Sequence, residues 1–290
     1  MRQIDSFFAT SIDRTLFHYT GVGSLVGMAS TCMVWASHIY FLNDSQEIFH
    51  ACDRLEEVIQ PQLAVANLTT EQLEFSKQFL LWVRSFHGNR YNLFVFSLSE
   101  EKSLLSQWRS YTPHGKGVSI GFSPELLLRL ADENQLKLAR CVYTVEEQRE
   151  LLTSLFQKML TTFSDRKPAP NLRGSPPECS YFSFLEDFRN EVFQVLAIIK
   201  HEAFKEEKEW RLISRYFANY TVPEIDFREG ASMLVPYIRL PLGPKRPIFE
   251  TVVLGPSPHE ELSFSALHMF LANKRLCGST ENSRIPYREW

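Results

Sequence analysis

Compact apolar runs alternate with amphipathic segments along the whole chain. Runs rich in branched and aromatic residues predict buried strands over 16–20, 33–36, 92–98, 117–122, 136–143, 210–214, 233–240 and 248–254. Apolar residues that recur every three or four positions predict helices over 24–30, 45–59, 103–111 and 184–200, and another that starts at Thr70. In the segment 45–59, one helix face carries Ile48, Cys52, Leu55 and Ile59, and we expect that face to be buried.

Capping patterns predict where several helices begin and end. N-caps are expected at Thr70, Ser123, Thr144 and Ser257. Thr144 and Glu147 have the spacing of a capping box. Gly278 is the predicted end of the last helix, and we expect the polar residues after it to be loosely held. Prolines and a glycine predict a loop over 166–177, and Pro236 predicts that its strand lies at an edge or a bulge of the sheet.

The order of the predicted elements favours an α+β fold with a mixed or antiparallel sheet. Strands are predicted at the start, the middle and the end of the chain, without a regular alternation of strand and helix. We expect one catalytic-type domain over 14–256 with helical insertions at about 45–88 and 144–200. An N-terminal extension over 1–13 and a C-terminal helix and tail over 257–290 complete the predicted organisation.

Composition narrows the class of protein. The 290 residues include 31 Lys and Arg against 34 Asp and Glu, a net charge of −3 that gives no general attraction to nucleic acid or anionic membranes. No apolar run approaches the roughly 20 residues that span a bilayer, and the first residues lack the apolar stretch of a signal peptide. Five scattered cysteines without a C-x-x-C pair argue against disulfides and zinc. These features predict a cytoplasmic protein without a membrane partner.

Sequence signatures of several large enzyme classes are missing. The chain contains no H-E-x-x-H, phosphate-binding P-loop or G-x-G-x-x-G pattern. The chemistry must therefore be sought in polar residues that interrupt the apolar strands. Four such clusters occur, at Phe17-His18-Tyr19-Thr20, at 41–47, from Phe96-Ser97 to Gly117, and at 204–213.

Each cluster has an ordinary structural interpretation beside a functional one. His18 is either a packed core histidine or a group that binds a hydroxylated ligand. Asn43, Asp44 and Glu47 form either a turn with a helix cap or one wall of a cleft. The segment 204–213 is either a solvated charge run or a strand that carries a functional acid.

Residue spacing predicts which side chains in these clusters face the same way. Trp108 and Tyr111 are three residues apart on a predicted helix, so they share a face on which a flat ring can stack. In the strand predicted over 210–214 and the charged residues just before it, successive side chains point to opposite faces. Its two faces carry Glu209, Arg211 and Ile213 on one side, and Trp210 and Leu212 on the other.

Taken in order, the clusters resemble a widespread bacterial family of domains of unknown function. That family carries His or Lys before Tyr near its start, then F-x-N-D-x-x-E, F-S-x-S, L-x-x-W-x-x-Y, G-K-G and E-x-E-W-R-L-I. The matching segments here are 17–20, 42–47, 96–117 and 207–213, with Val252 to Pro256 as the closing strand. The resemblance covers roughly residues 14–256.

The same order is more distantly similar to the ADP-ribosyltransferase superfamily. The resemblance is to its His-Tyr-Glu branch, which includes poly(ADP-ribose) polymerases and DarT-type toxins that modify DNA. It implies an ADP-ribosyltransferase-like fold and NAD as the substrate. It also implies a bacterial toxin or defence effector that transfers ADP-ribose to a protein or nucleic acid, releases nicotinamide, and is paired with an antitoxin or immunity partner.

This second resemblance implies roles for individual residues. His18 would bind a ribose of NAD, and Glu209, or alternatively Glu207, would stabilise positive charge on the sugar. The aromatic residue that stacks on nicotinamide would be Tyr111 or Trp108, although Tyr40 and Tyr91 compete for the role of the tyrosine. Ser106 or Ser103 would lie near the carboxamide. Further contacts with NAD are expected from Tyr19, Thr20, Asn43, Glu47, Ser97 and Arg211.

Two alternative functions stay open at this point. A nuclease-type toxin would gather a divalent metal through the oxygen ligands of Asn43, Asp44, Glu47 and Glu209. A binding or sensor module without catalysis would use the loop 166–177 and the polar C-terminus as partner surfaces. In that module Glu209 and Arg211 would be structural.

Overall fold

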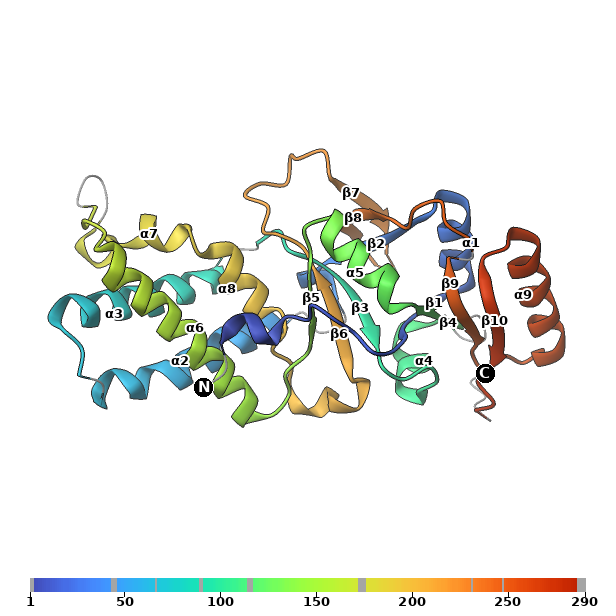
Figure 1. The fold of residues 1–290 in the computed structure, drawn as a ribbon, viewed down its shortest axis with the longest axis horizontal. Helices are drawn as coiled ribbons and strands as arrows, with labels where there is room; N and C mark the ends of the chain where they lie inside the picture. Colours follow the sequence, from blue (N-terminus) through green and yellow to red (C-terminus); the bar gives the residue numbers. More distant parts are fainter. Residues whose placement is uncertain are drawn as a thin grey trace.

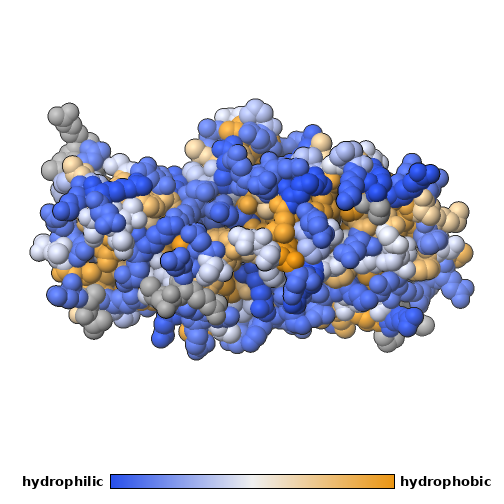
Figure 2. Space-filling view, viewed as in Figure 1, coloured by the Kyte–Doolittle hydropathy of each residue, from blue (hydrophilic) through white to orange (hydrophobic). Residues whose placement is uncertain are grey.

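The computed structural model describes residues 3–42, 46–65, 67–88, 91–113, 117–171, 176–230, 232–246 and 248–285. The molecule is elongated, with a helical bundle at one end and a twisted sheet with its covering helices at the other (Figure 1). Hydrophilic residues cover most of the face shown in Figure 2, and hydrophobic residues reach the surface in narrow patches between them.

The described strands form one sheet with the order β10-β9-β4-β1-β3-β2-β8-β7, and β6 and β5 extend it from β3. The pairing of β9 with β10 is parallel, and the other pairings are antiparallel. The predicted α+β class with a mixed sheet is therefore confirmed. The strands are β1 (Leu16–Gly21), β2 (Met33–His38), β3 (Phe94–Ser99), β4 (Gly117–Phe122), β5 (Lys137–Arg140), β6 (Glu209–Ile213), β7 (Ile225–Glu229), β8 (Leu234–Pro241), β9 (Phe249–Leu254) and β10 (Cys277–Asn282).

The sheet splits at β3, and this split positions the site described below. One edge of β3 pairs with β6 along residues 95–99. The other edge is shared, because β2 pairs with Phe94 and Val95 and β1 pairs with Ser99. Residues 96–98 therefore have no partner strand on that side, and their backbone groups must bond to something else.

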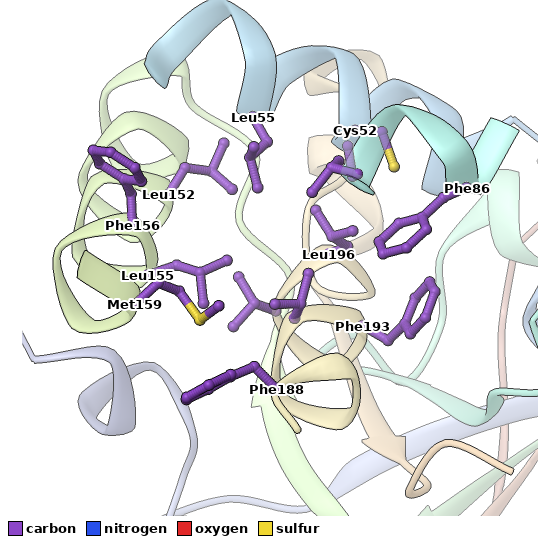
Figure 3. Close-up of a cluster of buried hydrophobic side chains, with 14 of the residues drawn as sticks. Cys52, Leu55, Phe86, Leu152, Leu155, Phe156, Met159, Phe188, Phe193 and Leu196 are labelled. Carbon is purple, nitrogen blue, oxygen red and sulfur yellow. The ribbon is translucent and has the colours of Figure 1, made fainter. Parts of the chain in front are cut away.

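The two predicted helical insertions fold together into one bundle. It consists of α2 (Glu47–Val65), α3 (Thr70–Arg84), α6 (Val145–Arg166), α7 (Phe182–Glu186) and α8 (Arg189–Leu196). Figure 3 shows its centre, where Leu55 of α2 and Leu155 of α6 lie in the core and Phe193 of α8 packs against Phe86. The predicted face of Ile48, Cys52, Leu55 and Ile59 is buried in this core, so the helical periodicity identified it correctly.

A second core lies on one face of the sheet. The helices α1 (Val22–Thr31), α5 (Pro124–Glu133) and α9 (Glu260–Lys274) cover this face with apolar residues such as Leu25, Leu127 and Leu271. The opposite face meets the bundle near β6 and the short helix α4 (Leu105–Tyr111) near β1. Polar side chains of β3 and β6 project on this opposite face.

Local bonding corrects two of the predicted helices. The N-cap of α3 is Thr69 rather than Thr70, and Thr69 and Gln72 form a reciprocal capping box. The predicted helix over 184–200 is two helices, because the backbone N–H groups of Asp187 and Phe188 bond to carbonyls three residues earlier and tighten the turn between α7 and α8. The caps predicted at Ser123 and Thr144 are confirmed.

Three predictions near the C-terminal half are wrong. β8 is an inner strand between β2 and β7, and Pro236 is tolerated because the pairing with β2 stops at Tyr237. The last helix starts at Glu260 after an N-cap at His259, and it ends in a left-handed Arg275. Gly278 lies in β10, so the segment 277–282 is a paired strand instead of a loose tail.

Three further features bear on the predictions: the N-terminal segment, the cysteines and the length of the apolar helices. The predicted N-terminal extension packs on the molecule, with Ile4 in the bundle core and Phe8 bridged to Ala139 of β5. The cysteines Cys32, Cys52, Cys141, Cys179 and Cys277 are free thiols. None of the helices in the described part of the chain is both long enough and apolar enough to cross a membrane.

Candidate active site

A pocket opens beside the split in the sheet. It is lined by residues of β1, β3, α4 and the entry into β6: Phe17, His18, Tyr19, Ser97, Leu98, Gln107, Tyr111, Glu207 and Glu209. Its empty space is about 320 Å³ with the open mouth included. Four segments far apart in the sequence therefore converge on one hollow.

His18 uses the unpaired part of β3 as its anchor. Its Nδ1 lies 2.9 Å from the carbonyl oxygen of Ser97, and its ring packs against Phe96 with 4.4 Å between the ring centroids. A carbonyl oxygen only accepts, so Nδ1 carries the proton and Nε2 has a lone pair for a ligand. Burial lowers the pKa of His18 to about 4, with a smaller contribution from the charge of Arg228. The imidazole is neutral near pH 7.

The low pKa of His18 predicts a pH dependence of stability. The unfolded histidine has a pKa near 6.5, so between about pH 4 and pH 6.5 the unfolded chain binds more protons at this position. The free energy of unfolding therefore rises with pH across this window, by at most about 1.4 kcal/mol per pH unit from this group. Urea unfolding of the wild type and of His18→Gln at pH 5 and pH 7 measures it. Equal pH dependence in the two proteins would contradict the assignment.

Five buried charged side chains lie behind the pocket and form what we call the charge cluster. It consists of Glu47, Lys200, Glu207, Glu209 and Arg211. Lys200 Nζ is 2.5 Å from Glu207 Oε2 and 2.6 Å from Glu209 Oε2. Arg211 donates to both Glu209 and Glu47, with closest distances of 2.8 Å and 2.7 Å. Three carboxylates face two cations, so the cluster has one negative charge in excess when all five groups are ionised.

Glu207 and Glu209 have opposite electrostatic environments. Burial alone would raise the pKa of Glu209, but the charges of Arg211 and Lys200 lower it well below its usual range. Burial raises the pKa of Glu207, and Lys200 offsets only part of that rise. Both oxygens of Glu209 bind cations. Among the described residues, the partner of Glu207 Oε1 is the hydroxyl of Tyr111 at 3.4 Å. Glu207 is therefore the carboxyl that is available to a ligand.

α4 supplies two further pocket residues. Tyr111 is 36 % exposed and reaches Glu207, so its ring is open to a ligand. Gln107 is only 7 % exposed and lines the pocket. Within the described residues its side-chain amide makes no hydrogen bond. Because Gln107 lines the pocket, its amide presents a donor and an acceptor there.

The structure separates the predicted aromatic pair. Trp108 does not line the pocket. It packs edge-on against Tyr19 at 4.7 Å between ring centroids and donates to Ser103 Oγ at 3.3 Å. The Tyr19 hydroxyl donates to the carbonyl of Glu101 and accepts from the N–H of Leu104. These contacts hold the start of α4 on β1, so Trp108 has a structural role.

Other predicted site residues fall into different environments. Ser97 lines the pocket and serves through its backbone carbonyl, while Thr20 is a β1 residue opposite Val118. The Ser106 hydroxyl is buried and does not line the pocket. Tyr91 lies in the bundle core, and Tyr40 packs against His38. Asn43 and Asp44 lie outside the described residues, as does Lys116.

Sequence reasoning missed Lys200 and Gln107. Lys200 directly follows the apolar stretch 197–199. This position was the feature of the sequence that could have indicated a buried lysine. Gln107 lies among the predicted helix residues 103–111, where a single polar residue carries no signal. Within the described part of the chain, no three His, Cys, Asp or Glu side chains are arranged to hold a metal ion. Glu47 and Glu209 already bind Arg211.

Part of the chain that forms this site matches a known protein family. Residues 107–212 match the family described as "Protein of unknown function (DUF2971)". The predicted resemblance to a family of unknown function is thereby confirmed. The DUF2971 segment starts at Gln107, contains Tyr111, and ends with the strand of Glu209 and Arg211. No curated protein and no solved structure matches the chain.

Proposed function

We propose that this protein cleaves the bond between nicotinamide and ribose in NAD and transfers ADP-ribose to a macromolecular acceptor. The observation that carries the proposal is the convergence of His18, Tyr111 and the two acids Glu207 and Glu209 on one pocket. These are the residues that the sequence resemblance to ADP-ribosyltransferases singles out. An ADP-ribosyltransferase-like fold is part of the same proposal.

The chemistry requires a negative group next to the sugar. When the bond between C1′ and the pyridine nitrogen breaks, its electron pair goes to the nitrogen and nicotinamide leaves as a neutral molecule. Positive charge develops on C1′ and the ring oxygen, and a nucleophilic atom of the acceptor then bonds to C1′ and loses its proton. A carboxylate in a dry pocket stabilises that charge by several kcal/mol. The excess negative charge of the cluster, at Glu207, meets this need.

The other pocket residues fit the neutral parts of the ligand. The exposed ring of Tyr111 offers a surface for stacking of the pyridine. Gln107 presents an amide, which is complementary to the carboxamide of nicotinamide because each has one donor and one acceptor side. The free Nε2 of His18 accepts a hydrogen bond from a ribose hydroxyl. Glu209 holds Lys200 and Arg211 and so acts as a positioning residue for Glu207.

Nicotinamide release from NAD by the purified protein tests this function. We expect release above that of a boiled sample, and labelled ADP-ribose on protein or nucleic acid when a cell extract is added as the source of acceptor. Release at background level in the presence of both classes of acceptor would reject the proposal. Nucleic acid cleavage that a chelator abolishes, without NAD consumption, would favour a metal-dependent nuclease instead.

A further inference from the structure

Arg228 of β7 lies on the same face of the sheet as the charge cluster. Paired residues of antiparallel strands point to one face, and the pairing places Ser37 on the face of Val95 and Arg211 on that of Ser97. A terminal nitrogen of Arg228 donates to Ser37 Oγ at 3.2 Å. Ser37 pairs with Val95, two residues before the Ser97 carbonyl that holds His18. The Arg228 side chain therefore reaches across β8 toward the split beside the pocket.

No carboxylate of the described residues pairs with Arg228. Within the described ranges its Nε is buried without an acceptor. Other arginines on this face differ, because Arg239 of β8 pairs with Asp226 and Arg211 pairs with Glu47 and Glu209. A buried guanidinium nitrogen without an acceptor costs free energy. A ligand anion beside the guanidinium would balance its charge.

We propose that Arg228 binds a phosphate group of the ligand whose other end occupies the pocket. Arginine presents a planar fork of N–H donors that matches the oxygens of a phosphate. With Ser37 holding one terminal nitrogen, the other terminal nitrogen stays available for the anion. The influence of the Arg228 charge on His18 agrees with a short separation between the two side chains.

The identification of this phosphate as part of NAD rests on the proposed function. In NAD the pyrophosphate is attached directly to the ribose that carries nicotinamide. A phosphate site next to a pocket for that ribose is therefore where the pyrophosphate of NAD would lie. The site itself requires only a phosphate-bearing ligand, so it is testable independently of NAD cleavage.

Calorimetric titration with ADP-ribose, and with nicotinamide as an uncharged probe, tests the site. In Arg228→Met we expect the affinity for ADP-ribose to fall at least about tenfold, and in Arg228→Lys several-fold, because lysine keeps the charge but lacks the fork. The affinity for nicotinamide should not change. Arg239→Met is the matched control, since Asp226 already neutralises that arginine, and we expect its affinity for ADP-ribose to stay within about twofold. Added salt should weaken ADP-ribose binding more in the wild type than in Arg228→Met.

The outcomes separate this site from the proposed function. Equal ADP-ribose affinity in the wild type and in Arg228→Met, or no binding of ADP-ribose to the wild type, would overturn the site. Normal NAD cleavage with an unchanged KM in Arg228→Met would also overturn it while the function stands. Conversely, ADP-ribose binding that depends on Arg228 without nicotinamide release would support the site and reject the function. If Arg228→Met does not fold, the comparison of Arg228→Lys with the wild type decides.

Discussion

Replacement of Glu207 by glutamine is expected to slow nicotinamide release from NAD by at least about a hundredfold, because removal of one preorganised electrostatic group typically has an effect of this size. Glutamine has nearly the same shape but cannot supply the negative charge that the sugar needs. The loss should appear in kcat, since the charge matters most in the transition state. Nicotinamide release over a range of NAD concentrations measures both kcat and KM.

The neighbouring Glu206 provides the matched control for this variant. Its side chain is exposed, whereas Glu207 is buried in the charge cluster. We expect Glu206→Gln to retain the wild-type rate. Because burial raises the pKa of Glu207, the wild-type rate should increase with pH as Glu207 loses its proton, and this acid limb should be missing in Glu207→Gln. A Glu207→Gln protein with the wild-type rate would remove Glu207 from the chemistry.

The second large effect concerns stability and follows from Arg211. This side chain is 1 % exposed and binds Glu47, Glu209 and the carbonyl of Ala197. Arg211→Met would leave three buried carboxylates with Lys200 as the single cation of the cluster. Removal of one partner from a buried ion pair typically costs about 3–5 kcal/mol, and we expect a decrease of this size in the free energy of unfolding. Urea unfolding at pH 7 measures it.

Two comparison variants show whether the cost comes from uncompensated charge. Arg215→Met removes an exposed arginine that pairs with the exposed Glu224, and such a pair contributes at most about 1 kcal/mol. Adding Glu47→Gln to Arg211→Met removes one of the stranded carboxylates and should restore part of the lost stability. A loss below 1 kcal/mol in Arg211→Met, or no recovery in the double variant, would contradict the electrostatic explanation.

The sequence allowed the elements of the sheet to be predicted better than their arrangement. Compact runs such as 117–122 are strands because branched and aromatic residues lose little by being extended and buried on both faces, and this signal is local. The split at β3 is not local, since it depends on two strands sharing one edge of a third. The break between α7 and α8 was missed because the apolar spacing continues through Asp187 and Phe188.

The candidate site was predictable to the extent that its residues lie in regular elements. Alternation correctly placed Glu209 and Arg211 on one face of β6, and they bind each other there. Their partners are Glu47, at the start of a bundle helix, and Lys200, in the loop after α8. No sequence spacing connects these two positions. Of the predicted aromatic pair, Tyr111 lines the pocket, whereas Trp108 packs against Tyr19 and faces away from it.

The charge cluster has a consequence for how this protein can be altered by recombination. Glu47 belongs to the bundle and Lys200 to the loop that follows α8, whereas Glu209 and Arg211 belong to the sheet. A chimera that takes its bundle from a relative would place different residues against Glu209 and Arg211. Charges without a partner would then remain where the bundle contacts the sheet. Exchanging the helical segments without the sheet should therefore yield insoluble or inactive protein.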